Sequence, residues 1–135
     1  MSHLEIYIDG ASKGNPGHSG VGIVILCQGR MIKSISGYIG KVTNNVAEYT
    51  ALIYALEEAL KLEAKSLKIN TDSQLLARQL NKIYKVKHQG LINLYNRATH
   101  LLSGFEKALI NHIPREENRS ADKLATEAIK KTLRR

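Results

Sequence analysis

Hydrophobic and polar residues alternate along the first part of the chain and then recur with helical spacing. From Leu4 to Asp9 an apolar side chain falls on every second position, which is typical of a strand with one buried face. The next eight residues hold three glycines and the pair Asn15-Pro16, so we expect a tight turn there. Two further apolar segments, 20–26 and 31–38, predict a hairpin.

From Val46 onward, apolar residues recur every three or four positions, which predicts a helix. Beyond this helix, strand-like and helix-like segments alternate. Strands are predicted at 66–71 and 107–113, and helices at 73–82, 91–105 and 120–133. The whole order favours an α/β fold with a mixed sheet, in which three antiparallel strands precede two parallel ones and helices flank both faces.

Four acidic residues are distinguished by the places that the predicted elements give them. Asp9 and Asp72 each follow a strand, and parallel neighbours would bring their carboxylates to one sheet edge about 5 Å apart. Glu48 and Asp122 fall on the apolar stripes of their helices and so face the sheet. Capping or a helix-dipole contact would explain Glu48, Asp72 or Asp122 taken singly. Caps need no common direction, so the joint pattern favours one shared site.

Converging carboxylates repel one another by roughly a few kcal/mol per pair at an effective dielectric constant of about 20. Bound divalent cations remove this repulsion. Ligands that are all oxygen atoms favour Mg2+ or Mn2+ over zinc, and the five histidines are too scattered for a zinc motif. The sequence therefore predicts a site for divalent metal ions.

Composition bounds the size and the partners of the protein. We expect one domain over residues 1–135, because this length can bury a single core. A net charge of +8 favours a polyanionic partner, although solubility alone would also explain it. The sequence shows neither a membrane-spanning run nor a signal peptide, and its one cysteine allows no internal disulfide. We expect a cytoplasmic monomer.

Four segments resemble the signature segments of type 1 ribonuclease H, in the family's order and over nearly the whole chain. They are Asp9-Gly-Ala-Ser-Lys-Gly-Asn-Pro-Gly, Thr43-Asn-Asn-Val-Ala-Glu48, Thr71-Asp72-Ser-Gln and Pro114-Arg-Glu-Glu-Asn118-Arg-Ser-Ala-Asp122. The resemblance implies the five-stranded ribonuclease H fold and a two-metal site of the four acids. It also implies endonucleolytic cleavage of the RNA strand of an RNA/DNA hybrid. With two Mg2+ ions we expect products with 5′-phosphate and 3′-hydroxyl ends.

The same resemblance implies contacts with the minor groove of the hybrid. The residues concerned are Asn15, Asn44, Asn45 and Gln74, with Ser12 and Lys13 in the same turn as Asn15. Short polar groups at loop ends suit this task, because they can bond 2′-hydroxyls and base edges in a wide, shallow groove.

One departure from the family concerns the grip on the substrate. Many bacterial members carry a tryptophan-rich basic protrusion between their middle helices. This chain has no tryptophan and only a short connection there, so it resembles the shorter form of the family. We expect a weaker, salt-sensitive grip that depends on Lys82, Lys85 and Lys87.

A second departure concerns the histidine that many members carry before the last acid. His112 has a similar spacing, but it falls in the last predicted strand, so we expect it to pack within the fold. Arg115 resembles an arginine that short members use instead, either to hold the scissile phosphate or to aid product departure.

Other functions fit parts of this pattern, since a fold alone does not determine chemistry. A junction resolvase or an integrase core would also use clustered acids on the same scaffold. A catalytically silent binder of hybrid or double-stranded RNA would keep the basic charge but would not need four acids. A sugar-kinase-like ATPase shares an acid and a glycine turn on its first strand, but 135 residues leave no second lobe to enclose a nucleotide.

Overall fold

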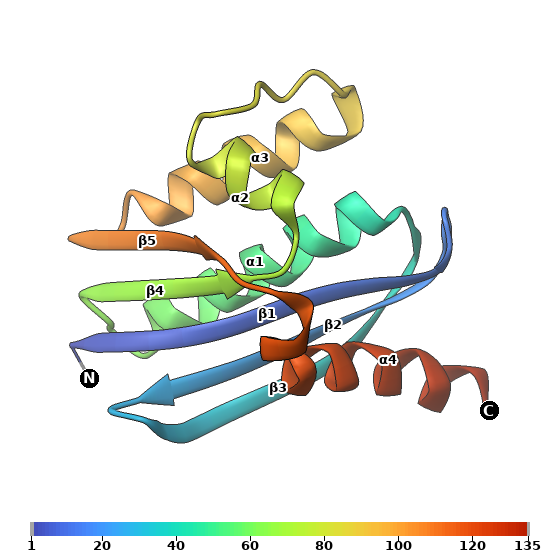
Figure 1. The fold of residues 1–135 in the computed structure, drawn as a ribbon, viewed down its shortest axis with the longest axis horizontal. Helices are drawn as coiled ribbons and strands as arrows, with labels where there is room; N and C mark the ends of the chain where they lie inside the picture. Colours follow the sequence, from blue (N-terminus) through green and yellow to red (C-terminus); the bar gives the residue numbers. More distant parts are fainter. Residues whose placement is uncertain (1, 135) are drawn as a thin grey trace.

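A five-stranded mixed sheet in the order β3-β2-β1-β4-β5 forms the centre of the computed structural model, which describes residues 2–134 (Figure 1). An antiparallel meander makes one side of the sheet, from strands β1 (His3–Gly14), β2 (Gly17–Cys27) and β3 (Arg30–Val42). Strands β4 (Ser66–Thr71) and β5 (Lys107–His112) run parallel to β1 and complete the other side. The predicted mixed sheet is confirmed.

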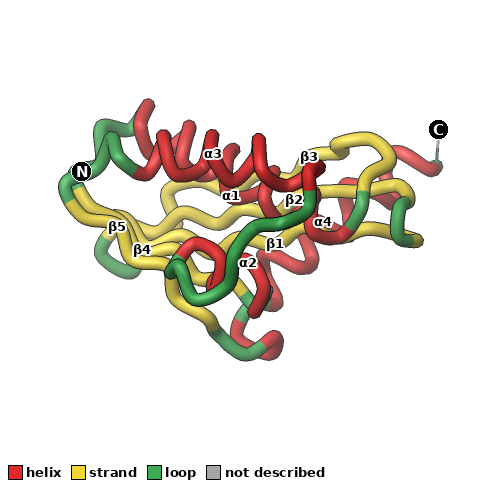
Figure 2. The backbone as a smooth tube through the Cα atoms, turned by 90° about the horizontal axis from the view of Figure 1, so that it is seen from above, coloured by secondary structure: helices red, strands yellow, loops and turns green. Residues whose placement is uncertain are grey.

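Helices cover both faces of this sheet, as predicted. The helices are α1 (Asn44–Lys61), α2 (Gln74–Leu80), α3 (Gln89–Leu102) and α4 (Arg119–Leu133). Figure 2 shows α1 and α3 on one side of the strands and α4 on the other, where it contacts β1, β2 and β3. Within residues 2–134, no helix combines the length and the apolar character that crossing a bilayer requires.

The core lies mainly between α1 and the sheet. Leu4, Ile6 and Ile8 on β1 are fully buried, as are Leu52 and Leu56 on α1. These are the positions that the period-two and helical patterns assigned to the interior. Burial of each such side chain contributes about 1.5–3 kcal/mol to folding.

The prediction of a turn directly after Asp9 is wrong, because β1 continues to Gly14 and pairs with β2 along this whole length. The turn shrinks to residues 15–16. Asp9 therefore lies inside β1 rather than at its end. It still lies beside the end of β4, because the parallel pairing stops where Ile8 meets Thr71.

Two glycines of the sheet allow close contact with the helices, and one of them, Gly10, lies in the segment that was predicted as a turn. A Cβ atom on Gly10 would lie 2.2 Å from the Ala47 carbonyl carbon of α1. A Cβ atom on Gly22 of β2 would lie 1.9 Å from the Ala121 carbonyl oxygen of α4. The two helices thus rest directly on the backbone of the sheet, one from each face.

This close packing gives a testable expectation for Gly10→Ala. The added methyl group must push α1 away from β1, so the free energy of unfolding should fall by about 1–3 kcal/mol in urea denaturation. Gly37→Ala is the matched control, because a Cβ atom there meets only Val21 Cγ2 at 3.6 Å, an ordinary contact. Its effect should stay within about 0.5 kcal/mol, and an equal loss in both variants would contradict the packing argument.

Candidate active site

Three carboxylates meet where β4 ends beside β1. Because Ile8 pairs with Thr71, the next residues, Asp9 and Asp72, project side by side. Glu48 reaches them from α1, and ligand oxygens of Asp9, Glu48 and Asp72 all lie within 4.8 Å of one another. Asp9 is only 5% exposed.

The backbone holds Glu48 in this cluster. The Gly10 N–H donates a hydrogen bond to Glu48 Oε1 at 2.6 Å, which is possible because α1 lies so close to β1. Glu48 is not a capping residue: the Thr43 hydroxyl caps α1 by accepting a hydrogen bond from the Val46 N–H at 3.2 Å. Capping therefore does not explain the position of Glu48.

Asp72 is not a capping residue either, since the Ser73 hydroxyl caps α2. Asp122 belongs to the first turn of α4, and its carboxyl contributes to raising the pKa of Asp9. Its side chain remains 38% exposed, and the Arg115 guanidinium approaches to 4.0 Å. Asp122 and Arg115 thus lie on the open side of the cluster.

The surroundings keep these acids protonated more strongly than usual. Burial raises the pKa of Asp9 to about 9, with further increases from the charges of Glu48 and Asp72 and from Asp122. Burial raises the pKa of Glu48 to about 8, against the hydrogen bond from Gly10. Burial also raises the pKa of Asp72, and contacts with Asn118 and Arg115 offset part of that rise.

A hollow of about 410 Å³ opens over the four acids. It is lined by Asp9, Gly10, Ala11, Ser12, Asn44, Glu48, Asp72, Arg115 and Asp122. Hard cations prefer oxygen ligands, and a cation here would replace the protons that the mutual repulsion of the acids retains. The donor set therefore fits Mg2+ or Mn2+.

A second hollow, of about 420 Å³, lies next to the first. Asn15, Thr43, Asn45, Lys85 and Lys87 are among its lining residues. Between the two hollows, Asn15 Oδ1 accepts a hydrogen bond of 3.0 Å from the backbone N–H of Asn44, the residue at the start of α1. The turn after β1 is thereby tied to α1.

The predicted substrate-binding residues fall into two groups. Asn15, Asn44, Asn45 and Ser12 line the hollows, whereas Lys13 and Gln74 are exposed outside the residues that line them. The Ser12 hydroxyl donates to the Val42 carbonyl at 2.9 Å, so it joins β1 to the end of β3.

Sequence reasoning missed Thr43 and Gln79, both of which line the second hollow. Gln79 is buried on α2 and accepts a hydrogen bond from the Tyr49 hydroxyl of α1. Nothing in the pattern distinguished Gln79 from a polar residue on the outer face of its helix. Thr43 precedes the predicted start of a helix, and this is the position that a capping residue takes.

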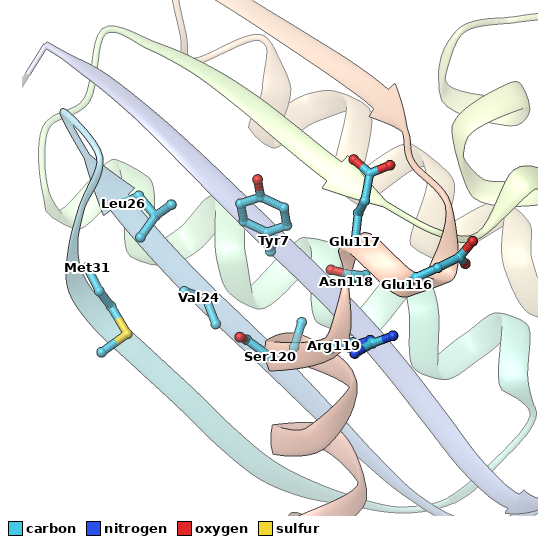
Figure 3. A pocket seen from close by; sticks show the side chains of 10 residues that line it. Tyr7, Val24, Leu26, Met31, Glu116, Glu117, Asn118, Arg119 and Ser120 are labelled. Atoms are coloured by element: carbon cyan, nitrogen blue, oxygen red, sulfur yellow. The ribbon is translucent and has the colours of Figure 1, made fainter.

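A third hollow lies on the face covered by α4. It measures about 440 Å³, slightly more than the other two, and it is lined by Tyr7, Val24, Met31, Asn118 and neighbouring residues (Figure 3). None of the four clustered acids is among its lining residues. Size alone therefore does not mark the chemical site of this protein.

The family model described as "Reverse transcriptase-like" matches residues 7–128. The crystal structure of RNase H1 from the halophilic archaeon Halobacterium salinarum superposes with a TM-score of 0.94 and is 40% identical, over 96% of this chain and 99% of that chain. The chain belongs to the ribonuclease H family. LC11-RNase H1 in complex with RNA/DNA hybrid gives a TM-score of 0.91 at 40% identity, over 96% and 99% of the two chains.

Among curated relatives, Ribonuclease HI of Halobacterium salinarum is 42% identical over 127 residues, which cover 93% of this chain and 64% of that protein. A longer relative, from Mycobacterium tuberculosis, is 40% identical over 126 residues. The match covers 92% of this chain but only 35% of that protein. The chain thus spans less than two thirds of either relative.

His112 and Arg115, the two residues considered before the last acid, take different places in the structure. His112 was predicted to pack within the fold, and this is wrong: it is exposed at the end of β5, while Ile113 takes the buried position. The charge of His112 instead contributes to lowering the pKa of Asp72. Arg115 lines the hollow over the acids, in a short 3-10 turn that spans Arg115–Glu117.

The short form of the family is also visible in this structure. Residues 81–88 alone connect α2 to α3. Their lysines are exposed, and two of them, Lys85 and Lys87, line the second hollow beside Asn15. Basic charge thus lies next to the acids although the protrusion is absent.

The raised pKa values predict how pH changes stability. Asp9 and Glu48 have ordinary pKa values near 4 and folded values of about 9 and about 8. Between these limits the folded state binds more protons than the unfolded state, so the free energy of unfolding without metal should fall as pH rises. Mg2+ competes with these protons, so it should raise Tm more at pH 8 than at pH 5.5.

Thermal unfolding with EDTA or Mg2+ at both pH values measures this effect. Asp9→Asn removes a carboxyl group that must take up a proton on folding at pH 8, so it should stabilise the metal-free protein at that pH by about 1 kcal/mol or more, while losing most of the Mg2+ shift. Glu106→Gln changes an exposed acid outside the cluster and should alter neither result. Equal Mg2+ shifts at both pH values in the unaltered protein would contradict the assignment.

Proposed function

We propose that this protein is an endonuclease that hydrolyses the RNA strand of RNA/DNA hybrids with two divalent metal ions, Mg2+ or Mn2+. The observation that carries the proposal is the clustering of Asp9, Glu48 and Asp72 beneath an open hollow that Asp122 also lines. Membership of the ribonuclease H family supports it, as does a relative whose structure contains an RNA/DNA hybrid.

The four carboxylates are the residues that would hold the metal ions. Asp9 is the candidate for a shared ligand, because it is the most buried of the four, lies within 4.8 Å of Glu48 and Asp72, and lines the same hollow as Asp122. When bound, the ions supply a water of lowered pKa and stabilise the oxygen that leaves the phosphorus. Such hydrolysis leaves 5′-phosphate and 3′-hydroxyl ends.

The other residues of the hollow bind and orient the substrate. Arg115 offers guanidinium donors at the open side, where a phosphate approaching the acids would pass. Its charge also reduces the repulsion that an incoming phosphate meets from the carboxylates. We assign Arg115 to the scissile phosphate or to the departing product.

Recognition of the hybrid follows from the two adjacent hollows. Asn15, Asn44 and Asn45 lie along their common border, where amide groups can bond 2′-hydroxyls and base edges in the minor groove. Lys85 and Lys87, further along, carry charge suited to the phosphates of a strand. Phosphate contacts position the duplex without reading its sequence.

Cleavage of defined substrates tests the proposal. End-labelled RNA/DNA hybrid, RNA duplex and DNA duplex are incubated in parallel with Mg2+, Mn2+ or EDTA. Internal cutting of the hybrid RNA strand, dependent on metal, is expected. Cleavage of branched DNA alone would favour a different nuclease on this fold, and tight binding of hybrid without cutting would favour a silent binder.

Asp72→Asn tests which residues carry the chemistry. The variant should lose cleavage at least about 100-fold and still bind the hybrid, because the amide keeps the shape of the side chain but weakens metal binding. Glu106→Gln, an exposed acid, is the matched control and should cut normally. Full turnover by Asp72→Asn would refute the assignment.

The lysines of the α2–α3 connection give a separate expectation. Lys85→Gln combined with Lys87→Gln should raise KM and reduce the slope of log affinity against log salt by about 1 for each phosphate that a lysine no longer neutralises, with kcat little changed. Lys107→Gln is the control, because Lys107 lies at the start of β5, at the opposite end of the parallel strands from the acids. An unchanged slope in the double variant would place the duplex elsewhere.

A further inference from the structure

Asn118 is a buried polar residue at the end of the connection between β5 and α4, directly before the first residue of α4. It is 1% exposed, although the residues on either side of it are exposed. Its backbone N–H donates to the Arg115 carbonyl at 2.9 Å, and its own carbonyl accepts from the Asp122 N–H at 3.1 Å. The backbone of Asn118 thus fixes both the turn that carries Arg115 and the helical turn that carries Asp122.

The side-chain amide of Asn118 reaches the other two strands of the site. Its Nδ2 donates a hydrogen bond of 2.8 Å to the carbonyl of Ile8, the residue before Asp9. The same amide also lowers the pKa of Asp72, at the end of β4, against the effect of burial. One primary amide therefore ties the start of α4 to β1, in the neighbourhood of the acid that follows β4.

The other atom of this amide has no such use. Asn118 Oδ1 is buried and accepts no hydrogen bond from any described group of the protein. In Figure 3 the Asn118 side-chain oxygen points toward Tyr7. Both residues line the third hollow, and none of the four clustered acids lines it. An unsatisfied buried oxygen destabilises a fold, and a small apolar residue would avoid it. The N–H groups of Asn118 are thus the part of the side chain that the structure uses.

We propose that Asn118 is a positioning residue of the active site, which fixes Asp72, Asp122 and Arg115 in place relative to Asp9. It touches neither substrate nor metal. It acts by holding the turn that carries Arg115 and the start of α4 against β1, beside the residue that precedes Asp9, and by keeping its amide near Asp72. The inference rests on the proposed function for its turnover readout, but metal binding tests it independently.

Asn118→Ala is the test, with Asn70→Ala as the matched control. Asn70 is equally buried on β4 and holds only Glu5 and Asn111, at 3.0 Å each. Both variants should lower Tm. Only Asn118→Ala should raise the Mg2+ concentration at half-maximal thermal shift, measured without nucleic acid, and only this variant should lower kcat. At least one of these two quantities should change by about 10-fold or more. KM for the hybrid should stay within about two-fold, since Asn118 lies behind the acids.

Asn118→Ser keeps one hydrogen-bond donor, so its Mg2+ midpoint and kcat should lie between those of Asn118→Ala and the unaltered protein. If the alanine variant fails to fold, the serine variant provides the test. An Asn118→Ala protein with reduced Tm but the Mg2+ midpoint and kcat of the unaltered protein would overturn the inference and leave a merely structural role. If the unaltered protein shows the Mg2+ shift but cuts no hybrid, the proposed function fails. The comparison of Mg2+ midpoints still decides the role of Asn118 in that case.

Discussion

The contact between α1 and the bare backbone of β1 at Gly10 is the constraint on which the site depends. With no side chain at Gly10, the helix lies close enough for the Gly10 N–H to hold Glu48 at 2.6 Å. The equivalent contact at Gly22 brings α4, and with it Asp122, onto the opposite face. Two glycines thus determine how closely Glu48 and Asp122, which come from the helices, approach the acids on the sheet.

This arrangement concentrates negative charge in a protein that is otherwise strongly basic. Three carboxylates within 4.8 Å of one another destabilise the metal-free fold, and the raised pKa values of Asp9 and Glu48 are the signs of that strain. The fold tolerates the cluster because its core is large and lies elsewhere, along β1, β4 and α1. Stability and chemistry are therefore separated in space: burial of the core stabilises the fold, and the clustered acids destabilise it.

The order of strands and helices could be predicted from the sequence because period-two and helical patterns are strong in β1, β4, α1 and α4. The clustering of the acids followed from the same patterns: Asp9 and Asp72 came from the parallel pairing, and Glu48 from its place on an apolar stripe. What could not be predicted depended on tertiary contacts. Glycines needed for close helix packing resembled a turn, so the end of β1 was misplaced. Likewise, no local pattern showed that β5 would expose His112.

Asn118 shows the same limit at the scale of one residue. Its sequence neighbours, two glutamates and an arginine, predict an exposed loop, and only the folded chain shows it buried against Ile8. A buried amide that ties a helix start to a strand leaves no mark on periodicity. Such residues are found from hydrogen bonds and burial rather than from spacing.

The four acids enter the site from β1, α1, the end of β4 and α4, so they are separated by as much as 113 positions along the polymer, from 9 to 122. No fragment that lacks α4 contains the complete set, and a chain emerging from synthesis gathers it last. The complete site therefore exists only after α4 has packed against the sheet, and a partly folded copy lacks the last of the four carboxylates.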